Sequence, residues 1–354
     1  MTSAAGTWAA LLLADPSPCL RWLVLTQLLQ RPAGDSEVRE LARLRHRDAR
    51  VAELVQLQHA DGTWQGVDVR GAGQHGPVVA TAYALMQLAY RGLSLQHPAV
   101  SKAAEYVFSQ QLQDGSWPLE GMSWPGKVDR DREAEGYSMI PLQTALPLRA
   151  LAACGYATDS RAERAYHWLL SKQLPDGAWP TGVASGNLGG VGGYRRLAHS
   201  RWGCRTNTTA ALICLAFHPK RRTSPSARRA LDLLLGQETR AAHALGVEVA
   251  RLAGAEPMRG GLTYFARFDA ALLLDLCWRV GAGPDDPRID GLAHFVLQQR
   301  GAFGLWQHRS QPQVSRWLSF DLLRSLSRLG QSSDWISLEP RTPFAPYPRR
   351  SKRY

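Results

Sequence analysis

One seven-residue phrase occurs three times in this chain, each time in the form Gln-x-x-Asp-Gly-x-Trp. The copies occupy residues 58–64, 111–117 and 173–179, and they begin 53 and 62 residues apart. Self-similarity at a period of tens of residues is the sequence signature of a repeat architecture. The phrase therefore predicts an array of similar units, although the length of the chain alone would suggest two domains.

Each copy follows a stretch with the apolar period of a helix and precedes a loop, so we expect the phrase to lie at helix C-termini. Asp-Gly is a turn signal, and its Gly can adopt the positive φ that closes a helix. The Trp side chain can then fold back under the turn. The Gln amide can bond backbone groups at the end of a neighbouring helix.

The predicted helices come in pairs along the chain. The first helix of a pair is apolar nearly all round and the second has one charged face, so the first should be buried and the second should cover it. This pattern predicts an all-α, (α/α)6 toroid over residues 1–330, with inner-helix N-termini around one end of a central cavity. Residues 331–354 are expected to form a basic, Pro-rich tail. The pairs are 18–31 with 37–57, 77–92 with 98–110, 138–155 with 160–172, 207–217 with 225–238, 265–281 with 287–299, and a sixth that begins with 314–330.

Several features bear on where the protein resides. Its longest uncharged apolar runs fall short of the roughly twenty residues that a membrane-spanning helix needs. The N-terminus lacks the basic region of a signal peptide. The five cysteines are scattered and form no Cys-x-x-Cys, which favours reduced thiols in a cytoplasmic protein.

The net charge of +12 suggests affinity for a diphosphate, an acidic membrane surface or nucleic acid. Much of the excess lies in residues 43–50, 220–229 and 349–353, which favours a solvated face. Peripheral contact with an anionic membrane stays open. We expect no nucleic-acid partner, because the basic residues do not interleave with aromatics as in a known module.

The repeated phrase resembles the repeat of squalene and oxidosqualene cyclases and, more loosely, that of protein prenyltransferase β-subunits. With a degenerate copy at residues 301–306, it extends from Gln58 to Trp306. The resemblance implies an α/α toroid that binds an isoprenoid substrate, and it favours an enzyme with terpene cyclase or prenyltransferase-like activity. Squalene cyclases join two such toroids, whereas this chain has length for one.

Cyclases that start by protonation resemble each other in an Asp-x-Asp-Asp motif, whose middle Asp is the general acid. This chain has no such motif. The closest string, residues 129–135, contains Asp131, but its interleaved arginines would lower carboxylate pKa values. A solvated loop is favoured there, and the alternative is a metal-diphosphate site or displaced acid cluster.

Alignment of the inner helices places Asp269 near a helix start, with Asp321 about half a turn further along its own helix. Asp at a helix start is ordinary capping chemistry. Aromatic neighbours, however, suit protonation and cation stabilisation in a cavity. Asp269 is therefore the first candidate acid and Asp321 the second, and if they face each other one should titrate high. The candidate aromatic substrate-binding residues are Tyr137, Trp202, Tyr264, Phe265, Phe268, Trp317 and Phe320.

Two further segments suggest sites. Cys204 lies in a phrase resembling one of the prenyltransferase β-subunits, with His199 as a possible partner, but the rest of the zinc ligand set is missing, so zinc is disfavoured. The Gly-rich loop 182–193 could form a lid whose basic rim, Arg195, Arg196 and Arg205, meets a diphosphate. A surface loop is the plainer interpretation.

The sequence thus favours a terpenoid cyclase-like protein with an aromatic-lined cavity, in which a cavity Asp protonates an isoprenoid or other apolar substrate. No cofactor is firmly implied, although a diphosphate substrate would bring Mg²⁺. Two alternatives remain open. One is a non-catalytic toroid that binds a lipid or a protein, and the other is an (α/α)6 carbohydrate-active enzyme with two carboxylates.

Overall fold

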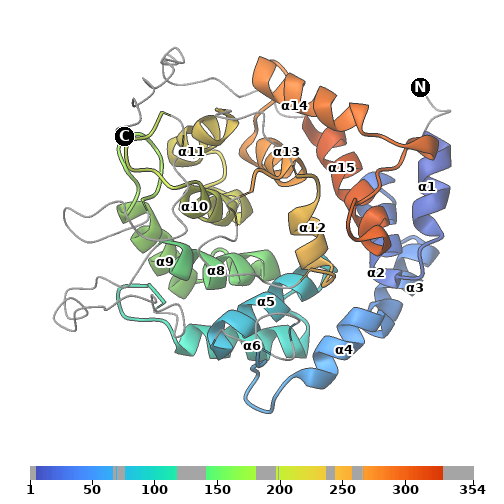
Figure 1. Cartoon of the computed structure of the whole chain (residues 1–354). Helices are drawn as coiled ribbons and strands as arrows, with labels where there is room; N and C mark the ends of the chain where they lie inside the picture. The colour runs from blue at the N-terminus through green and yellow to red at the C-terminus, as the bar shows by residue number, and fades with distance from the viewer. Residues whose placement is uncertain are drawn as a thin grey trace, which may run out of the picture.

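The helices form two concentric rings, as seen in Figure 1. The computed structural model describes residues 5–66, 69, 76–117, 141–180, 197, 199–236, 244–256, 265 and 267–329. Within these residues the only β-type pairings are two isolated bridges, Pro180 with Gly203 and Ala244 with Asp269. The predicted all-α toroid is confirmed.

The inner ring is built from helices that are buried on nearly every side. In α8 all eleven residues are buried, and in α10 every residue from Thr206 to Ala216 is buried. From α5 to α15, neighbouring inner helices contact one another in chain order, and α15 contacts η1 at the start of the chain. The inner elements are α2 (Pro18–Leu23) continued by the π-helical η1 (Val24–Leu28), α5 (Pro77–Tyr90), α8 (Pro141–Leu151) continued by η3 (Ala152–Tyr156), α10 (Arg205–Phe217), α13 (Ala270–Val280) and α15 (Ser315–Leu329).

The outer ring is amphipathic, as predicted. In α6, for example, the buried residues recur at helical spacing on one face. The helix α1 also packs in this region, against the turn η5 that follows α14. The remaining elements are α1 (Ala5–Leu13), α3 (Ser36–Leu44), η2 (Arg45–Arg47), α4 (Ala49–Leu57), α6 (Pro98–Ser109), α9 (Ser160–Ser171), α11 (Pro225–Leu235), α12 (Val247–Leu252), α14 (Pro287–Gln298), η5 (Ala302–Gly304) and η6 (Pro312–Val314).

Two predicted helix boundaries are wrong for the same reason. The helix expected over 37–57 is broken at Asp48, whose carboxylate accepts the Arg50 and Val51 backbone N–H groups and starts α4. The helix expected from residue 265 begins only at Ala270, because Asp269 caps it. Local capping by an Asp side chain competes with helix continuation.

The repeated Trp joins three segments. The Trp117 indole N–H donates to the Val107 carbonyl at 2.8 Å, and its backbone N–H donates to Thr144 Oγ1 at 3.3 Å. The outer helix, the turn and the next inner helix are thus held together. Equivalent pairs of bonds are made by Trp64 to Leu54 and Thr81, by Trp179 to Leu169 and Thr208, and by Trp306 to Val296 and Ser319.

The repeated Gln links one outer helix to the next. The Gln111 amide donates to Gly115 O at 2.9 Å and to Arg161 O, in the first turn of α9, at 3.0 Å. Gln58 reaches Ala99 and Gln173 reaches Ser226 in the same way. Gly115 has φ +94°, and an added Cβ would lie 2.5 Å from a backbone atom of Arg164, so only Gly fits. The predicted Gln contact is confirmed.

No helix in the described part of the chain is long and apolar enough to cross a membrane. The tail predicted over 331–354 lies outside the described residues.

Candidate functional site: a central cavity closed by an inserted helix

The short helix α12 lies inside the ring. It contacts α13, the next helix in the chain, and also α5 and α15, which are not its neighbours in sequence. Figure 1 shows it near the centre of the toroid. The helix was not predicted, because its six residues are too few to show a period. It fills part of the space that an empty toroid would enclose.

Asp269 fixes the N-terminal end of α12. Its Oδ1 accepts the backbone N–H of Gly246 at 2.9 Å, and its Oδ2 accepts that of Glu248 at 2.8 Å. Oδ1 also accepts the Ala271 N–H, which caps α13. Burial raises the pKa of Asp269, although these three N–H groups oppose the shift. Both carboxylate oxygens are therefore engaged by backbone groups.

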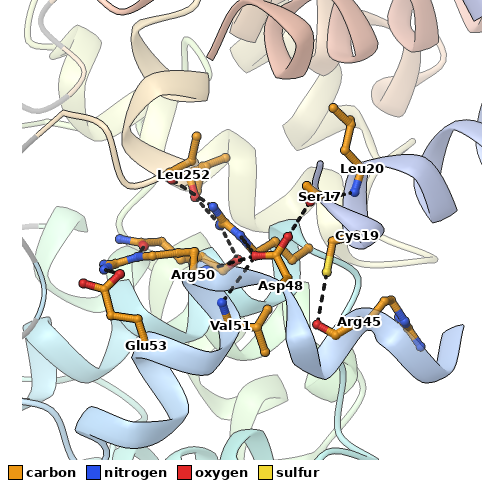
Figure 2. A network of polar contacts seen from close by, with 12 residues as sticks. Ser17, Cys19, Leu20, Arg45, Asp48, Arg50, Val51, Glu53 and Leu252 are labelled. Carbon is orange, nitrogen blue, oxygen red and sulfur yellow. Dashed lines mark hydrogen bonds and ion pairs between the residues drawn. The ribbon is translucent and has the colours of Figure 1, made fainter. Parts of the chain in front are cut away.

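Arg91 fixes the other end of α12. Its guanidinium donates to the Leu252 and Ala253 carbonyls at 3.0 and 2.9 Å, and its Nε lies 3.3 Å from Asp48 Oδ1. Figure 2 shows this network, in which Asp48 also accepts the Ser17 hydroxyl. Since Asp48 caps α4, the same carboxylate starts an outer helix and orients the arginine that holds α12.

A buried ion pair joins the middle of α12 to the inner ring. Glu248 Oε1 lies 2.6 Å from Arg149 Nη1 on α8, and both side chains are about 95% buried. Arg251 lies 3.5 Å from the same carboxylate. A charged pair removed from water requires close geometry to be tolerated, so α12 is anchored at both ends and in between.

A cavity of about 440 Å³ lies between α12 and the inner ring. Its lining residues on α5, α8 and α10 come from the second half of each helix. Met86, Ile213 and Val249 are buried, whereas Gln27, Phe217 and Arg328 are half-buried. The cavity therefore has its floor at α12 and its rim near the inner-helix C-termini, whereas the sequence predicted a site at their N-termini.

Asp321 lies in the wall of this cavity. Its Oδ2 accepts the Tyr90 hydroxyl at 2.8 Å, and its Oδ1 lies 2.7 Å from Arg324 Nη2. Burial raises the pKa of Asp321 and nearby Asp275 adds to the effect, while Arg324 and the Tyr90 hydrogen bond oppose it. The net direction is upward, so the carboxyl group retains its proton to a higher pH than an ordinary Asp does.

Asp275 on α13 shares the same arginine. Arg324 Nη2 lies 3.1 Å from Asp275 Oδ1, and Arg279 Nε lies 2.7 Å from Asp275 Oδ2. Burial opposes ionisation of Asp275, but the two guanidinium groups outweigh it and lower its pKa. Two carboxyl groups in one cavity wall thus have pKa values shifted in opposite directions, a pattern common at acid-base sites.

Aromatic rings and guanidinium groups alternate at the rim. Arg279 lies over Phe217 at 4.5 Å and over Trp278 at 4.6 Å, measured from Cζ to each ring centroid. Arg328 lies over the Trp278 ring at 4.6 Å. The rim therefore offers both apolar surface and positive charge.

The candidate residues named from the sequence are dispersed. Asp321 lines the central cavity, whereas Asp269, Phe268 and Arg205 line a separate pocket of about 30 Å³. Trp317, Phe320 and Phe265 are buried in the core, and Trp202 is 40% exposed. No contact joins Asp269 to Asp321. Asp131, Tyr137, Arg195, Arg196 and Tyr264 lie outside the described residues.

The zinc candidates Cys204 and His199 belong to no metal-binding group. Within the described residues, no three His, Cys, Asp or Glu side chains gather as they would around an ion. Cys204 is buried at the start of α10.

Sequence reasoning missed Tyr90, Asp275, Arg279, Arg324 and Arg328. A signal for the four charged residues is present, because charged residues on buried inner helices must face either a partner or a cavity. Asp275 and Arg279 are four residues apart on α13, and Arg324 and Arg328 are four apart on α15. Such spacing places each pair on one helix face.

The ring of helix pairs, with a repeated Trp that bonds each outer helix to the next inner helix, defines an α/α toroid protein. The family model of the squalene-hopene cyclase C-terminal domain matches residues 43–190. This segment includes the three full copies of the repeat. The predicted resemblance to squalene cyclases is thereby confirmed over residues 43–190.

Several solved structures are similar to this chain. One is a protein from Actinoplanes, which shares 15% sequence identity over 92% of this chain and 98% of its own, with a TM-score of 0.45. The type II terpene cyclase MstE from Scytonema without ligand shares 14% identity over 78% of this chain and 95% of its own, with a TM-score of 0.34. An MstE variant in complex with its substrate geranylgeranyl dihydroxybenzoate also shares 14% identity, over 78% and 94%, with a TM-score of 0.33.

Proposed function

We propose that this terpenoid cyclase-like protein binds an isoprenoid or similar apolar molecule in the central cavity, and that Asp321 protonates it to start a cyclisation. The observation that carries the proposal is a buried carboxyl group in the wall of the central cavity, where burial raises its pKa. The family match over residues 43–190 supports the same class of ligand.

The cavity suits a molecule of this kind. Its volume of about 440 Å³ falls within the range of about 300–1,000 Å³ that is usual for small-molecule sites. Its walls are largely aliphatic and aromatic, with Met86, Ile213, Leu276 and Trp278 among the lining residues. Burial of an apolar chain against such walls supplies the affinity.

The proposed reaction starts with one proton transfer. The Asp321 carboxyl O–H gives its proton to an alkene carbon of the substrate, and the π electrons of that alkene form the new C–H bond. A carbocation remains on the substrate and a carboxylate on Asp321. Tyr90 O–H and Arg324 are placed to stabilise that carboxylate, while the Tyr90 and Trp278 rings lining the cavity attract the cation.

Binding without turnover is the second candidate, and one observation favours it. Arg324 lies 2.7 Å from Asp321, and a close cation favours the ionised form of a carboxyl group. An Asp321 that stays ionised would leave a toroid that holds an apolar ligand and does not cyclise it.

The test is incubation of the purified chain with geranylgeraniol, geranylgeranyl diphosphate and squalene, followed by gas chromatography and native mass spectrometry. A cyclised product from the wild type that is absent with Asp321→Asn supports the proposal. A bound ligand without product leaves the second candidate. Absence of binding by all three molecules contradicts both.

A further inference from the structure

The cavity wall formed by α13 and α15 carries more positive than negative charge. Arg279 and Arg324 are balanced by Asp275 and Asp321, with N to O distances of 2.7 to 3.1 Å. On the floor, Glu248 balances Arg149. The fourth cation of the lining, Arg328, has no carboxylate within ion-pair distance among the described residues.

Within the described part of the chain, Arg328 is held in place by an aromatic ring. It lies in the last turn of α15, and its guanidinium lies 4.6 Å from the Trp278 ring centroid. Burial lowers the pKa of Arg328, and the like charges of Arg324 and Arg279 lower it further, while Asp275 opposes the shift. A half-buried guanidinium near two other cations is costly, and an anion bound beside it would relieve that cost.

The position of Arg328 separates the polar part of the cavity from the apolar part. Deep in the cavity, Met86, Ile213 and Val249 supply aliphatic surface beside the mutually neutralised Glu248 and Arg149, whereas Arg328 and Trp278 are half-buried at the rim. A ligand that satisfied both regions would place an apolar chain inward and a charged group outward.

A simpler role for Arg328 is compensation of the helix dipole, because basic residues suit the last turn of a helix. That role predicts a change in stability only. It predicts no preference of the cavity for one ligand head group over another, so the two roles are separable by experiment.

We propose that Arg328, with Trp278 and Arg279 beside it, forms an anion subsite at the rim of the cavity, so that the ligand is an apolar chain ending in a carboxylate or a phosphate group. This inference rests on the proposed binding of an isoprenoid-like molecule in the same cavity. It deepens that function by giving the ligand a charged end and an orientation.

The test compares three molecules that share one chain: geranylgeraniol, geranylgeranoic acid and geranylgeranyl diphosphate. Dissociation constants are measured by titration calorimetry for the wild type, Arg328→Gln, Arg328→Lys and the control Arg39→Gln. Arg39 lies exposed on α3, and its substitution changes the net charge equally.

The wild type should bind at least one of the two anions about tenfold or more tightly than the alcohol, and Arg328→Gln should remove that preference without weakening the alcohol. A tenfold change corresponds to about 1.4 kcal/mol. Arg328→Lys should retain most of the preference, and Arg39→Gln all of it. The carboxylate and diphosphate arms show which head group the subsite accepts.

Three results would overturn the inference. Equal affinity for alcohol and both anions removes the subsite while leaving the proposed function in place. If Arg328→Gln still binds the anions more tightly than the alcohol, that preference is due to other residues. Failure of all three molecules to bind overturns the proposed function and this inference together.

Discussion

Tyr90 and Asp321 are 231 positions apart in sequence, yet the Tyr90 hydroxyl donates a hydrogen bond of 2.8 Å to Asp321 Oδ2. The bond crosses from α5 to α15 and so spans the point where the ring closes. Tyr90 also packs on Trp317, with ring centroids 5.0 Å apart. The carboxyl group in the cavity wall is thereby fixed by residues from both ends of the chain.

We predict that Asp321→Asn lowers cyclisation by at least about 100-fold, the scale of a lost general acid. The amide keeps the shape of the carboxyl group but has no acidic proton, and Arg324 retains Asp275 as its partner. Product formation is followed by gas chromatography, with the circular dichroism spectrum as control for folding. Full turnover in this variant would remove Asp321 from the mechanism.

The raised pKa of Asp321 predicts that turnover falls as the pH increases. The protonated form is the active one, so activity should be full well below the folded-state pKa and should decline as the pH rises through it. Because that pKa is raised, the decline should occur above the ordinary value of about 3.9. A pH-rate profile measures this, and Tyr90→Phe should move the decline upward, since its hydrogen bond lowers the pKa. A rate independent of pH would argue against the acid.

Asp269 is expected to behave differently, since its oxygens accept three backbone N–H groups. Asp269→Asn replaces one acceptor oxygen by an NH₂ group and leaves at least one buried N–H unpaired, at a cost of about 1–3 kcal/mol. Amide hydrogen exchange at Gly246 and Glu248 should accelerate, because α12 loses its anchor. Unchanged exchange rates would contradict this anchoring role.

The hydrogen bond from the repeated Trp to the next inner helix predicts a stability difference between two buried threonines. Thr144 accepts the backbone N–H of Trp117, whereas the buried Thr206 hydroxyl has no hydrogen-bond partner among the residues that the structure describes. Thr144→Val should therefore lower the free energy of unfolding by about 1–3 kcal/mol, and the matched control Thr206→Val should change it little. Urea denaturation measures the free energy of unfolding of both variants. Equal effects would show that the Trp117–Thr144 hydrogen bond adds nothing to stability.

The contacts of the repeated Gln and Trp also show which parts of the fold could be predicted from the sequence. Helix periods and the Asp-Gly turn are local signals, so the rings and the Gln contacts followed from them. Thr81, Thr144 and Ser319 lie near the starts of their inner helices, as Asp269 does. In the structure these hydroxyls accept backbone N–H groups, as Asp269 does. A shared position at the inner-helix starts thus marked a structural role.

The cavity depends on long-range contacts that local sequence patterns do not indicate. The segment forming α12 is short, and its insertion depends on Arg91, Arg149 and Asp269 from three separate helices. The cavity consequently lies toward the inner-helix C-termini. Asp321 could be named because it stands beside aromatic residues, but its partner Tyr90 is set by ring closure, which sequence spacing does not reveal.

The last prediction concerns the ion pair that seats α12. Glu248→Leu leaves Arg149 buried without its partner at 2.6 Å, and loss of one member of a buried pair costs about 3–5 kcal/mol. Arg149→Met in the same chain removes the stranded charge, so the double variant should recover most of the lost stability. Denaturant unfolding of the two single variants and the double variant measures the coupling. Simple addition of the two single losses would mean that the pair is not coupled, and α12 would then be held by Asp269 and Arg91 alone.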